Sequence, residues 1–213
     1  MNLKFLYIVT IVAMNYFLPT KVGELTPSTM TSLKSSSSII KDYLMVPGPI
    51  GFMKKNYSLS FSAHPSPTYF QQEYITKGEL PEKYNEMVMV QLMFGEMKIQ
   101  DAVASKIKQL QLRKANDIMV NFKVTNLPKS GEIILEFTLS DGQGAAKIAE
   151  WNVYRYHSYS NITTKQTGIS LFGFSKRFYG AKAYQLFNDA NNKLSIMKAE
   201  FLKLHSPDLK PSK

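Results

Sequence analysis

The sequence is poor in the residues that build common metal and redox centres. It has no cysteine among 213 residues, three histidines and one tryptophan. The lack of cysteine excludes disulfides, thiolate nucleophiles and Cys-ligated zinc or iron–sulfur centres. Three histidines leave little for a His-rich metal site, so we expect no cofactor. Apolar residues at 44% and charged residues at 20% are ordinary for a globular protein, and the length predicts one domain with a tail.

The N-terminal apolar run is too short for a membrane-spanning helix, which needs about 20 residues. It extends over fourteen residues, from Phe5 to Leu18, and follows a start with one positive charge, Lys4. This pattern is typical of an export signal, which we predict over residues 1–23. Because no Ala-x-Ala cleavage site is present, an uncleaved N-terminal anchor is the alternative, with membrane contact through this segment. Both alternatives predict an exported protein, in the periplasm or outside the cell.

A Ser/Thr-rich stretch follows, and we predict a flexible tether over residues 24–45. Residues 24–38 lack aromatic side chains and end in four consecutive serines. Such a stretch cannot bury enough apolar surface to offset the entropy lost on ordering. We therefore predict a single folded domain over residues 46–206 and a disordered tail over residues 207–213.

Alternating apolar and polar residues predict most of this domain as strands. Hairpin turns at residues 128–131 and 141–144 indicate antiparallel pairing. A helix is predicted from residue 99, with Ile99, Val103, Ile107 and Leu110 on one stripe and Lys106 largely off it. A longer amphipathic helix is predicted from residue 183 to residue 204. The predicted class is α+β: one antiparallel sheet of about six to seven strands packed by two helices, one after the third strand and one long and C-terminal.

The acidic and histidine side chains offer weak candidates for catalysis. Glu79, Glu82 and Glu86 cluster around a loop and a strand start, and with a histidine they would suit a small hydrolase. Solvated loop charges are the ordinary alternative. The three histidines, at positions 64, 157 and 205, suit surface or capping roles. No Gly-x-Ser-x-Gly elbow and no phosphate-binding glycine loop is present, so we predict no catalytic residue and no enzyme activity.

Methionines recur on one face of a predicted strand. Met87, Met89 and Met93 alternate with other residues over residues 86–94. Thioethers select Cu(I), so a copper-binding protein is one alternative function. Methionine also fills gaps in a core, which is the simpler interpretation. We therefore predict no metal site, and these three residues are the Cu(I) ligands of the alternative function.

The formal net charge of +10 is concentrated near the C-terminus. Residues 151–213 hold ten Lys and Arg against three Asp and Glu, whereas residues 24–100 hold seven of each. An acidic partner is therefore expected. Basic and aromatic residues interleave in this part, and they predict a binding patch. Its five members are Arg155, Tyr156, Lys176, Arg177 and Lys182. A strand with one aromatic core face and one charged outer face is the alternative.

One segment resembles a pattern in uncharacterised exported bacterial proteins. Glu73-Tyr74-Ile75 and Gly78-Glu79 precede Tyr84-Asn85-Glu86-Met87-Val88-Met89-Val90-Gln91, where an aromatic residue leads into Glu-Met-Val-x-Val-Gln. The order of elements also resembles the fold of the extrinsic photosystem II subunit P and of a Ran-binding import factor. That resemblance implies an antiparallel sheet flanked by helices, in proteins that are mostly binding or assembly accessories.

Together these features predict an exported, non-enzymatic accessory protein of the bacterial cell envelope. It would contact a protein or an anionic surface component through its basic C-terminal part. Nucleic acid is disfavoured as a partner because the chain carries an export signal. The small hydrolase and the Cu(I)-binding protein stay open as alternatives.

Overall fold

The computed structural model describes residues 40–46, 48–186 and 192–212. The predicted export signal and residues 24–39 of the predicted tether lie outside the described residues. The described residues belong to one compact unit that begins at Ile40.

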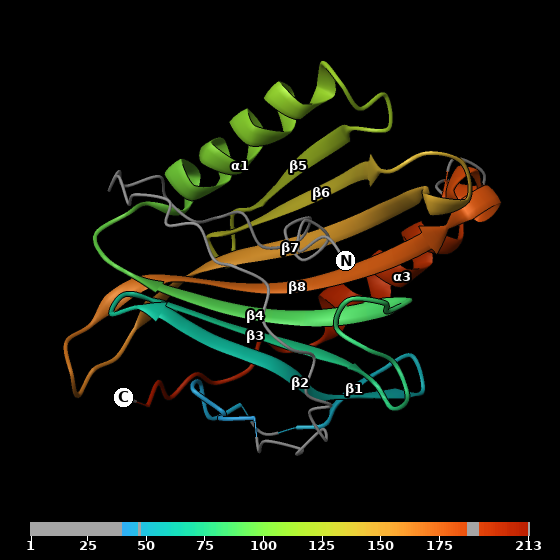
Figure 1. The fold of residues 1–213 in the computed structure, drawn as a ribbon. Coiled ribbons are helices and arrows are strands. Elements are labelled where there is room, and N and C mark those ends of the chain that lie inside the picture. Colours follow the sequence, from blue (N-terminus) through green and yellow to red (C-terminus); the bar gives the residue numbers. More distant parts are fainter. Residues whose placement is uncertain (1–39, 47, 187–191, 213) are drawn as a thin grey trace, which may run out of the picture. The chain divides into compact units, whose positions relative to one another are not determined.

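An eight-stranded antiparallel sheet forms the body and curls into a half-barrel (Figure 1). Neighbouring strands follow the order β1-β2-β3-β4-β8-β7-β6-β5. The chain crosses from β4 in the middle to β5 at the far edge, and hairpins then return it to β8, which pairs with β4. The strands are β1 (Ile50–Phe52), β2 (Lys55–Ser66), β3 (Tyr69–Thr76), β4 (Glu86–Phe94), β5 (Asn121–Leu127), β6 (Glu132–Asp141), β7 (Ile148–Ser160) and β8 (Thr167–Tyr179).

The prediction of six to seven strands packed by two helices is wrong, because the sheet has eight strands. The additional strand is β1, three residues that follow Pro49 and pair with Lys55, Asn56 and Tyr57. A strand of three residues is too short to show an alternation of apolar and polar residues in the sequence. The neighbouring β2 also runs through Pro65, a residue type that ordinarily interrupts a strand. Proline is tolerated there because β1 pairs with β2 only as far as Tyr57, which leaves the rest of that edge unpaired.

The C-terminal α-helix is shorter than the long helix predicted over residues 183–204. Two α-helices are described, α1 (Ile99–Lys114) and α3 (Lys193–Lys203). The predicted helix start instead forms a short 3-10 helix, η3 (Gly180–Tyr184), and a second one, η2 (Gly144–Ala146), precedes β7. Residues 187–191 lie outside the described part. No helix in the described ranges combines the length and apolarity that a membrane span requires.

The two helices cover opposite faces of the sheet. Phe137 and Glu136 are neighbours in β6, and successive strand residues point to opposite faces. Lys106 of α1 lies 5.0 Å from the centroid of the Phe137 ring, whereas Lys198 of α3 donates to Glu136 Oε2 at 2.6 Å. We call these two sides the α1 face and the α3 face.

The hydrophobic core lies on the α3 face. The Phe201 ring of α3 packs 4.8 Å from the centroid of Phe172 and 5.8 Å from that of Phe174, both in β8. Burying side chains of this size contributes roughly 1.5–3 kcal/mol each. The alternation predicted for β4 is correct on this face. Other buried core residues include Val88, Val90, Leu92, Leu194 and Met197.

The described fold is wider than the predicted domain of residues 46–206. Leu44 is fully buried in the core, although it lies within the predicted tether. Lys210 donates its backbone N–H to the Leu44 carbonyl at 2.9 Å, and Ser212 donates to the Tyr43 carbonyl at 2.8 Å. The segment after α3 therefore packs beside residues 43–44, and the two ends of the described body support each other.

Candidate functional site

Three of the five predicted patch residues line one pocket. Lys176, Arg177 and Lys182 lie around a pocket of about 630 Å³ at the end of β8, together with Lys193. We call it the basic pocket. Its full lining is Asn85, Lys176, Arg177, Phe178, Tyr179, Ala181, Lys182, Gln185 and Lys193. Arg155 and Tyr156 lie elsewhere: Arg155 pairs with Glu132 at 2.7 Å, and Tyr156 is buried on the α1 face.

Local chain geometry explains how the basic pocket forms. Lys176 and Arg177 are adjacent in β8, so their side chains leave on opposite faces. Gly180 then turns the chain with a φ of 57°, a left-handed conformation that favours glycine. Its N–H donates to the Lys147 carbonyl at 2.7 Å, which fixes η3 and its Lys182 against the start of β7. The first residue of α3, Lys193, completes the basic group.

Lys176 is neutralised by a buried carboxylate. The Glu86 oxygens accept hydrogen bonds from Lys176 Nζ at 2.7 Å, Lys55 Nζ at 2.7 Å and Tyr57 OH at 2.8 Å. Burial alone would raise the pKa of Glu86, but the hydrogen bonds from Lys176 and Lys55 outweigh it and lower the pKa to about 2. Glu86 is therefore an anion at neutral pH, and it holds the charge of Lys176 in place.

Arg177 is neutralised in the same way on the α1 face. Its Nε donates to Glu150 Oε2 at 2.5 Å, and its guanidinium lies 3.9 Å from the centroid of the Tyr84 ring. The Tyr84 hydroxyl donates to the same Glu150 oxygen at 2.9 Å. Glu150 is only 1% exposed, so this ion pair is a buried one. Burial and the Glu150 charge both raise the pKa of Tyr84, which keeps the hydroxyl as a donor.

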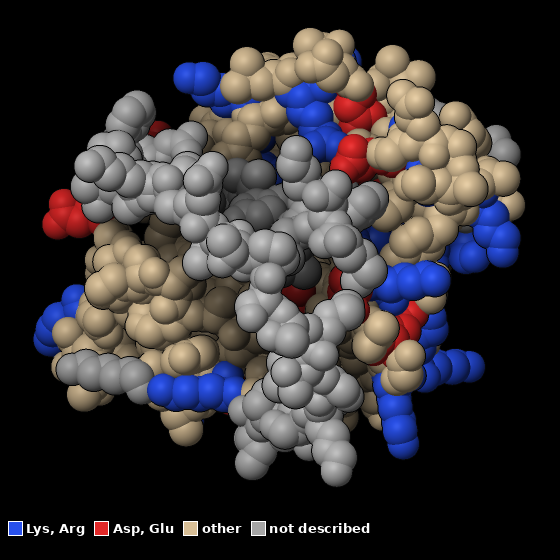
Figure 2. All heavy atoms as spheres, in the orientation of Figure 1, with Lys and Arg blue, Asp and Glu red and all other residues tan. Residues whose placement is uncertain are grey.

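The basic excess of the C-terminal sequence is largely compensated in space. Carboxylates from other strands pair with Arg155, Lys176, Arg177 and Lys198. Figure 2 accordingly shows Lys and Arg side chains dispersed around the margin of the visible face rather than in one patch. Within the described ranges, Lys182 and Lys193 have no ion-pair partner, and both are exposed. They are the uncompensated charges of the basic pocket.

The α1 face carries an unusual number of buried polar side chains. Glu73 is 7% exposed and accepts a hydrogen bond from Gln71 Nε2 at 2.6 Å. Burial raises the pKa of Glu73 to about 7, although Gln71 and Arg177 oppose the rise. Further buried polar residues of this face are Gln91, Lys106, Glu150, Asn152, Ser175 and Arg177. The sequence prediction missed this cluster because its members are spread over α1, β3, β4, β7 and β8.

The three methionines proposed for Cu(I) lie on the same α1 face of β4. Met87 and Met89 are buried, and Met93 is half-buried. The sulfur of Met89 accepts a hydrogen bond from Gln91 Nε2 at 2.9 Å. Copper binding stays a prediction that an anaerobic Cu(I) titration would test. Among the described residues, no group of three or more His, Cys, Asp or Glu side chains is placed to hold a metal ion.

The residues proposed for a hydrolase make separate contacts. Glu86 is fixed by Lys55, Lys176 and Tyr57, while Glu79 Oε1 accepts from the Asn85 side chain at 2.6 Å. Glu82 is exposed.

The three histidines have contacts or exposure of their own. His64 stacks on Phe70 with centroids 3.9 Å apart, and His205 is exposed. His157 lies 2.7 Å from Ser170 Oγ, a pairing that the sequence prediction missed because thirteen residues separate the two. Ser170 is 1% exposed, so this hydroxyl is poorly placed to attack a substrate.

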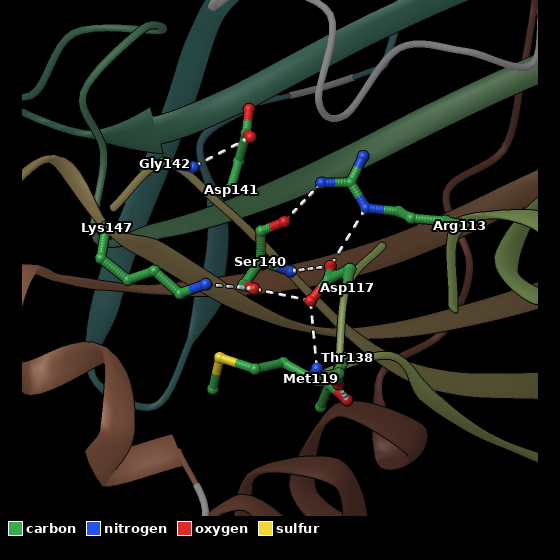
Figure 3. A network of polar contacts seen from close by, with 8 residues as sticks. All are labelled: Arg113, Asp117, Met119, Thr138, Ser140, Asp141, Gly142 and Lys147. Atoms are coloured by element: carbon green, nitrogen blue, oxygen red, sulfur yellow. Dashed lines mark hydrogen bonds and ion pairs between the residues drawn. The ribbon is translucent and has the colours of Figure 1, made fainter. Parts of the chain in front are cut away.

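A polar network fixes the connection from α1 to β5 (Figure 3). Asp117 accepts hydrogen bonds from Ser140 Oγ at 2.7 Å, the Ser140 N–H at 2.6 Å and the Met119 N–H at 3.0 Å. Although burial opposes it, the Ser140 bonds and Arg113 hold the pKa of Asp117 below its usual range. Lys147 Nζ donates to Ser140 Oγ at 2.8 Å. Because the hydroxyl donates to Asp117 and accepts from an ammonium, the network is structural and offers no free nucleophile.

Comparison with known proteins gives a family without a function. A protein-family model matches residues 44–205. The chain belongs to that uncharacterised family. No curated protein and no solved structure matches the chain. The resemblance to the photosystem II subunit P and the Ran-binding factor therefore stays a prediction.

Proposed function

We propose that the protein is a non-enzymatic binding protein of the bacterial cell envelope, which contacts an acidic partner through the basic pocket. The observation that carries this proposal is the different state of the four cations there. Lys176 and Arg177 are held by Glu86 and Glu150, whereas Lys182 and Lys193 have no carboxylate partner among the described residues. Lys176 and Arg177 therefore form part of the pocket wall, whereas Lys182 and Lys193 are available to a ligand.

The chemistry of the lining supports an anionic group as the ligand. Exposed ammonium groups attract carboxylates and phosphates and steer their encounter with the protein. Gln185 adds a side-chain amide that can donate hydrogen bonds, and Asn85 adds a second amide, which also donates to Glu79 Oε1. The pocket volume of about 630 Å³ lies in the ordinary range for ligand sites. The proposal of an export location rests on the N-terminal sequence pattern alone.

Salt dependence is the first test of this function. The purified protein is mixed with the envelope fraction of its source bacterium at about 0.1 M and about 1 M NaCl, between which the Debye length falls from about 10 Å to about 3 Å. We expect strong retention at low salt and loss at high salt, because the interactions of exposed lysines are largely screened there. Retention that ignores salt contradicts an electrostatic contact.

A further inference from the structure

Lys106 is a buried cation that forms no ion pair with a carboxylate among the described residues. It is 8% exposed on α1, and its Nζ lies 5.0 Å from the centroid of Phe137 and 6.0 Å from that of Tyr154. Within the described part of the chain it has no ion pair and no hydrogen bond to a carboxylate. Burial lowers the pKa of Lys106 to about 8 against the opposing charge of Glu150, so the ammonium is still mostly protonated at neutral pH.

Two more polar groups of the same face are unsatisfied. Asn152 is fully buried, and its Nδ2 has no hydrogen-bond partner among the described residues, although its Oδ1 accepts from Ser175 Oγ at 2.5 Å. The hydroxyl of Tyr156 is also buried, and no residue in the described ranges forms a hydrogen bond with it. A buried donor that makes no hydrogen bond costs about 1–3 kcal/mol of stability, so its presence in a folded protein calls for an explanation.

Strand register brings these donors to one place. Asn152 pairs with Phe137 across β6 and β7, so it lies beside the ring that Lys106 covers. Tyr154 and Tyr156 follow Asn152 at alternate positions of β7, and their ring centroids are 6.3 Å apart. Lys106, Asn152 and Tyr156 therefore gather around the rings of Phe137 and Tyr154.

The carboxylate acceptors on this face are engaged, in contrast to Lys106, Asn152 Nδ2 and the Tyr156 hydroxyl. Glu150 accepts from Arg177 at 2.5 Å and from Tyr84 at 2.9 Å, and Glu73 accepts from Gln71 at 2.6 Å. The groups left without a hydrogen-bond acceptor are thus an ammonium, an amide N–H and a hydroxyl, which lie beside aromatic rings. Such a set complements a group that carries negative charge and only accepts hydrogen bonds.

We propose that the α1 face holds a second ligand site, separate from the basic pocket, for a small molecule that carries a carboxylate next to an apolar group. The carboxylate would accept from Lys106 Nζ and Asn152 Nδ2, and the apolar part would pack on Phe137 and Tyr154. Charge-assisted hydrogen bonds of this kind are among the stronger ones in proteins.

Phenylacetate and its neutral analogue phenylacetamide are the probes for this site. Calorimetric titration of the purified protein should show phenylacetate binding at least about tenfold tighter than phenylacetamide, because only the carboxylate complements Lys106. Lys106→Gln should weaken phenylacetate binding by about tenfold or more, whereas Lys108→Gln, an exposed position of the same helix, should leave it unchanged. The double variant Lys182→Gln/Lys193→Gln should bind phenylacetate like the wild type, which separates this site from the basic pocket.

A measurement on the wild type covers the case in which Lys106→Gln fails to fold. The side-chain amide signals of Asn152 in a nitrogen-15 NMR spectrum should shift on addition of phenylacetate and stay unchanged with phenylacetamide. Three results overturn the proposal: no phenylacetate binding, equal binding of the two probes, or unchanged affinity in a folded Lys106→Gln variant. An unmoved Asn152 signal at saturating phenylacetate places the ligand elsewhere and also overturns it.

Discussion

Replacing Glu86 with glutamine removes the charge on which three donors converge. The carboxylate accepts from Lys176 and Lys55, both at 2.7 Å, and from the Tyr57 hydroxyl at 2.8 Å. Glutamine keeps the size and one acceptor oxygen, but it leaves two ammonium groups without a counterion. Lys176 is the more serious loss, because its side chain is only 14% exposed. Breaking a buried pair on one side leaves an uncompensated charge, so Glu86→Gln should destabilise the fold.

The magnitude follows from the pKa of Glu86, about 2 against an ordinary value of 4.5. One pKa unit corresponds to about 1.4 kcal/mol, which gives roughly 3.5 kcal/mol as an upper value. Lys55 is 50% exposed, so water screens its contribution to the stabilisation of the Glu86 carboxylate. We expect a loss of about 2 kcal/mol in the free energy of unfolding at pH 7. A lowered carboxylate pKa stabilises above about pH 4.5, and this contribution disappears as the pH falls toward 2.

Urea unfolding followed by tryptophan fluorescence measures this loss directly. The sole tryptophan, Trp151, is 2% exposed and pairs with Lys176 across β7 and β8, so its emission reports on this region. Glu200→Gln is the matched control, because Glu200 forms an exposed pair with Lys203 that is worth at most about 1 kcal/mol. The reasoning is refuted if Glu86→Gln is as stable as the wild type at pH 7. It is also refuted if the difference between the two does not shrink between about pH 4.5 and pH 2.

Three further substitutions test other parts of the structure. Glu73→Gln should stabilise the fold by about 2–3 kcal/mol at pH 8, since a pKa raised to about 7 means that the folded state disfavours the carboxylate; this gain should vanish below about pH 4.5, and an unfolding series across pH checks it. Arg177→Met should destabilise the protein by about 3–5 kcal/mol, because it leaves the buried Glu150 charge unpaired, and a wild-type urea midpoint would contradict this. Gly168→Ala should cost about 1–3 kcal/mol by thermal unfolding, because the new Cβ would lie 2.2 Å from the Met93 carbonyl oxygen; an unchanged melting temperature would show that the strands adjust freely.

Elements with a clear period were predictable from the sequence. The alternation of Val88, Val90 and Leu92 predicted β4 and its core face, and these residues are buried there. The stripe on α1 was only partly correct. Its buried residues are Ile99, Val103, Lys106 and Leu110, spaced 4, 3 and 4. The prediction chose Ile107 over Lys106 on hydrophobicity, yet a lysine stem can lie along apolar surface, and here the ammonium rests on aromatic rings.

The candidate site was less predictable, because pairing across the sheet decides which charges stay free. Counting residues placed ten cations in the last part of the chain. The strand order brings Glu86 of β4 and Glu150 of β7 beside Lys176 and Arg177 of β8, which neutralises both cations. No local sequence pattern shows that these carboxylates and cations become neighbours in the sheet. The hydrogen bond from Ser175 to Asn152 was likewise not predictable, since it depends on the register between β7 and β8.

The most direct test of the central claim is whether Lys182 and Lys193 make the envelope contact. The measurement is retention of the double variant Lys182→Gln/Lys193→Gln on the envelope fraction at about 0.1 M NaCl, where electrostatic contacts are only partly screened. The matched control is Lys108→Gln/Lys114→Gln, which removes the same charge from exposed positions of α1. The basic pocket predicts loss of retention in the first variant and wild-type retention in the second. Equal retention by the two variants would contradict it.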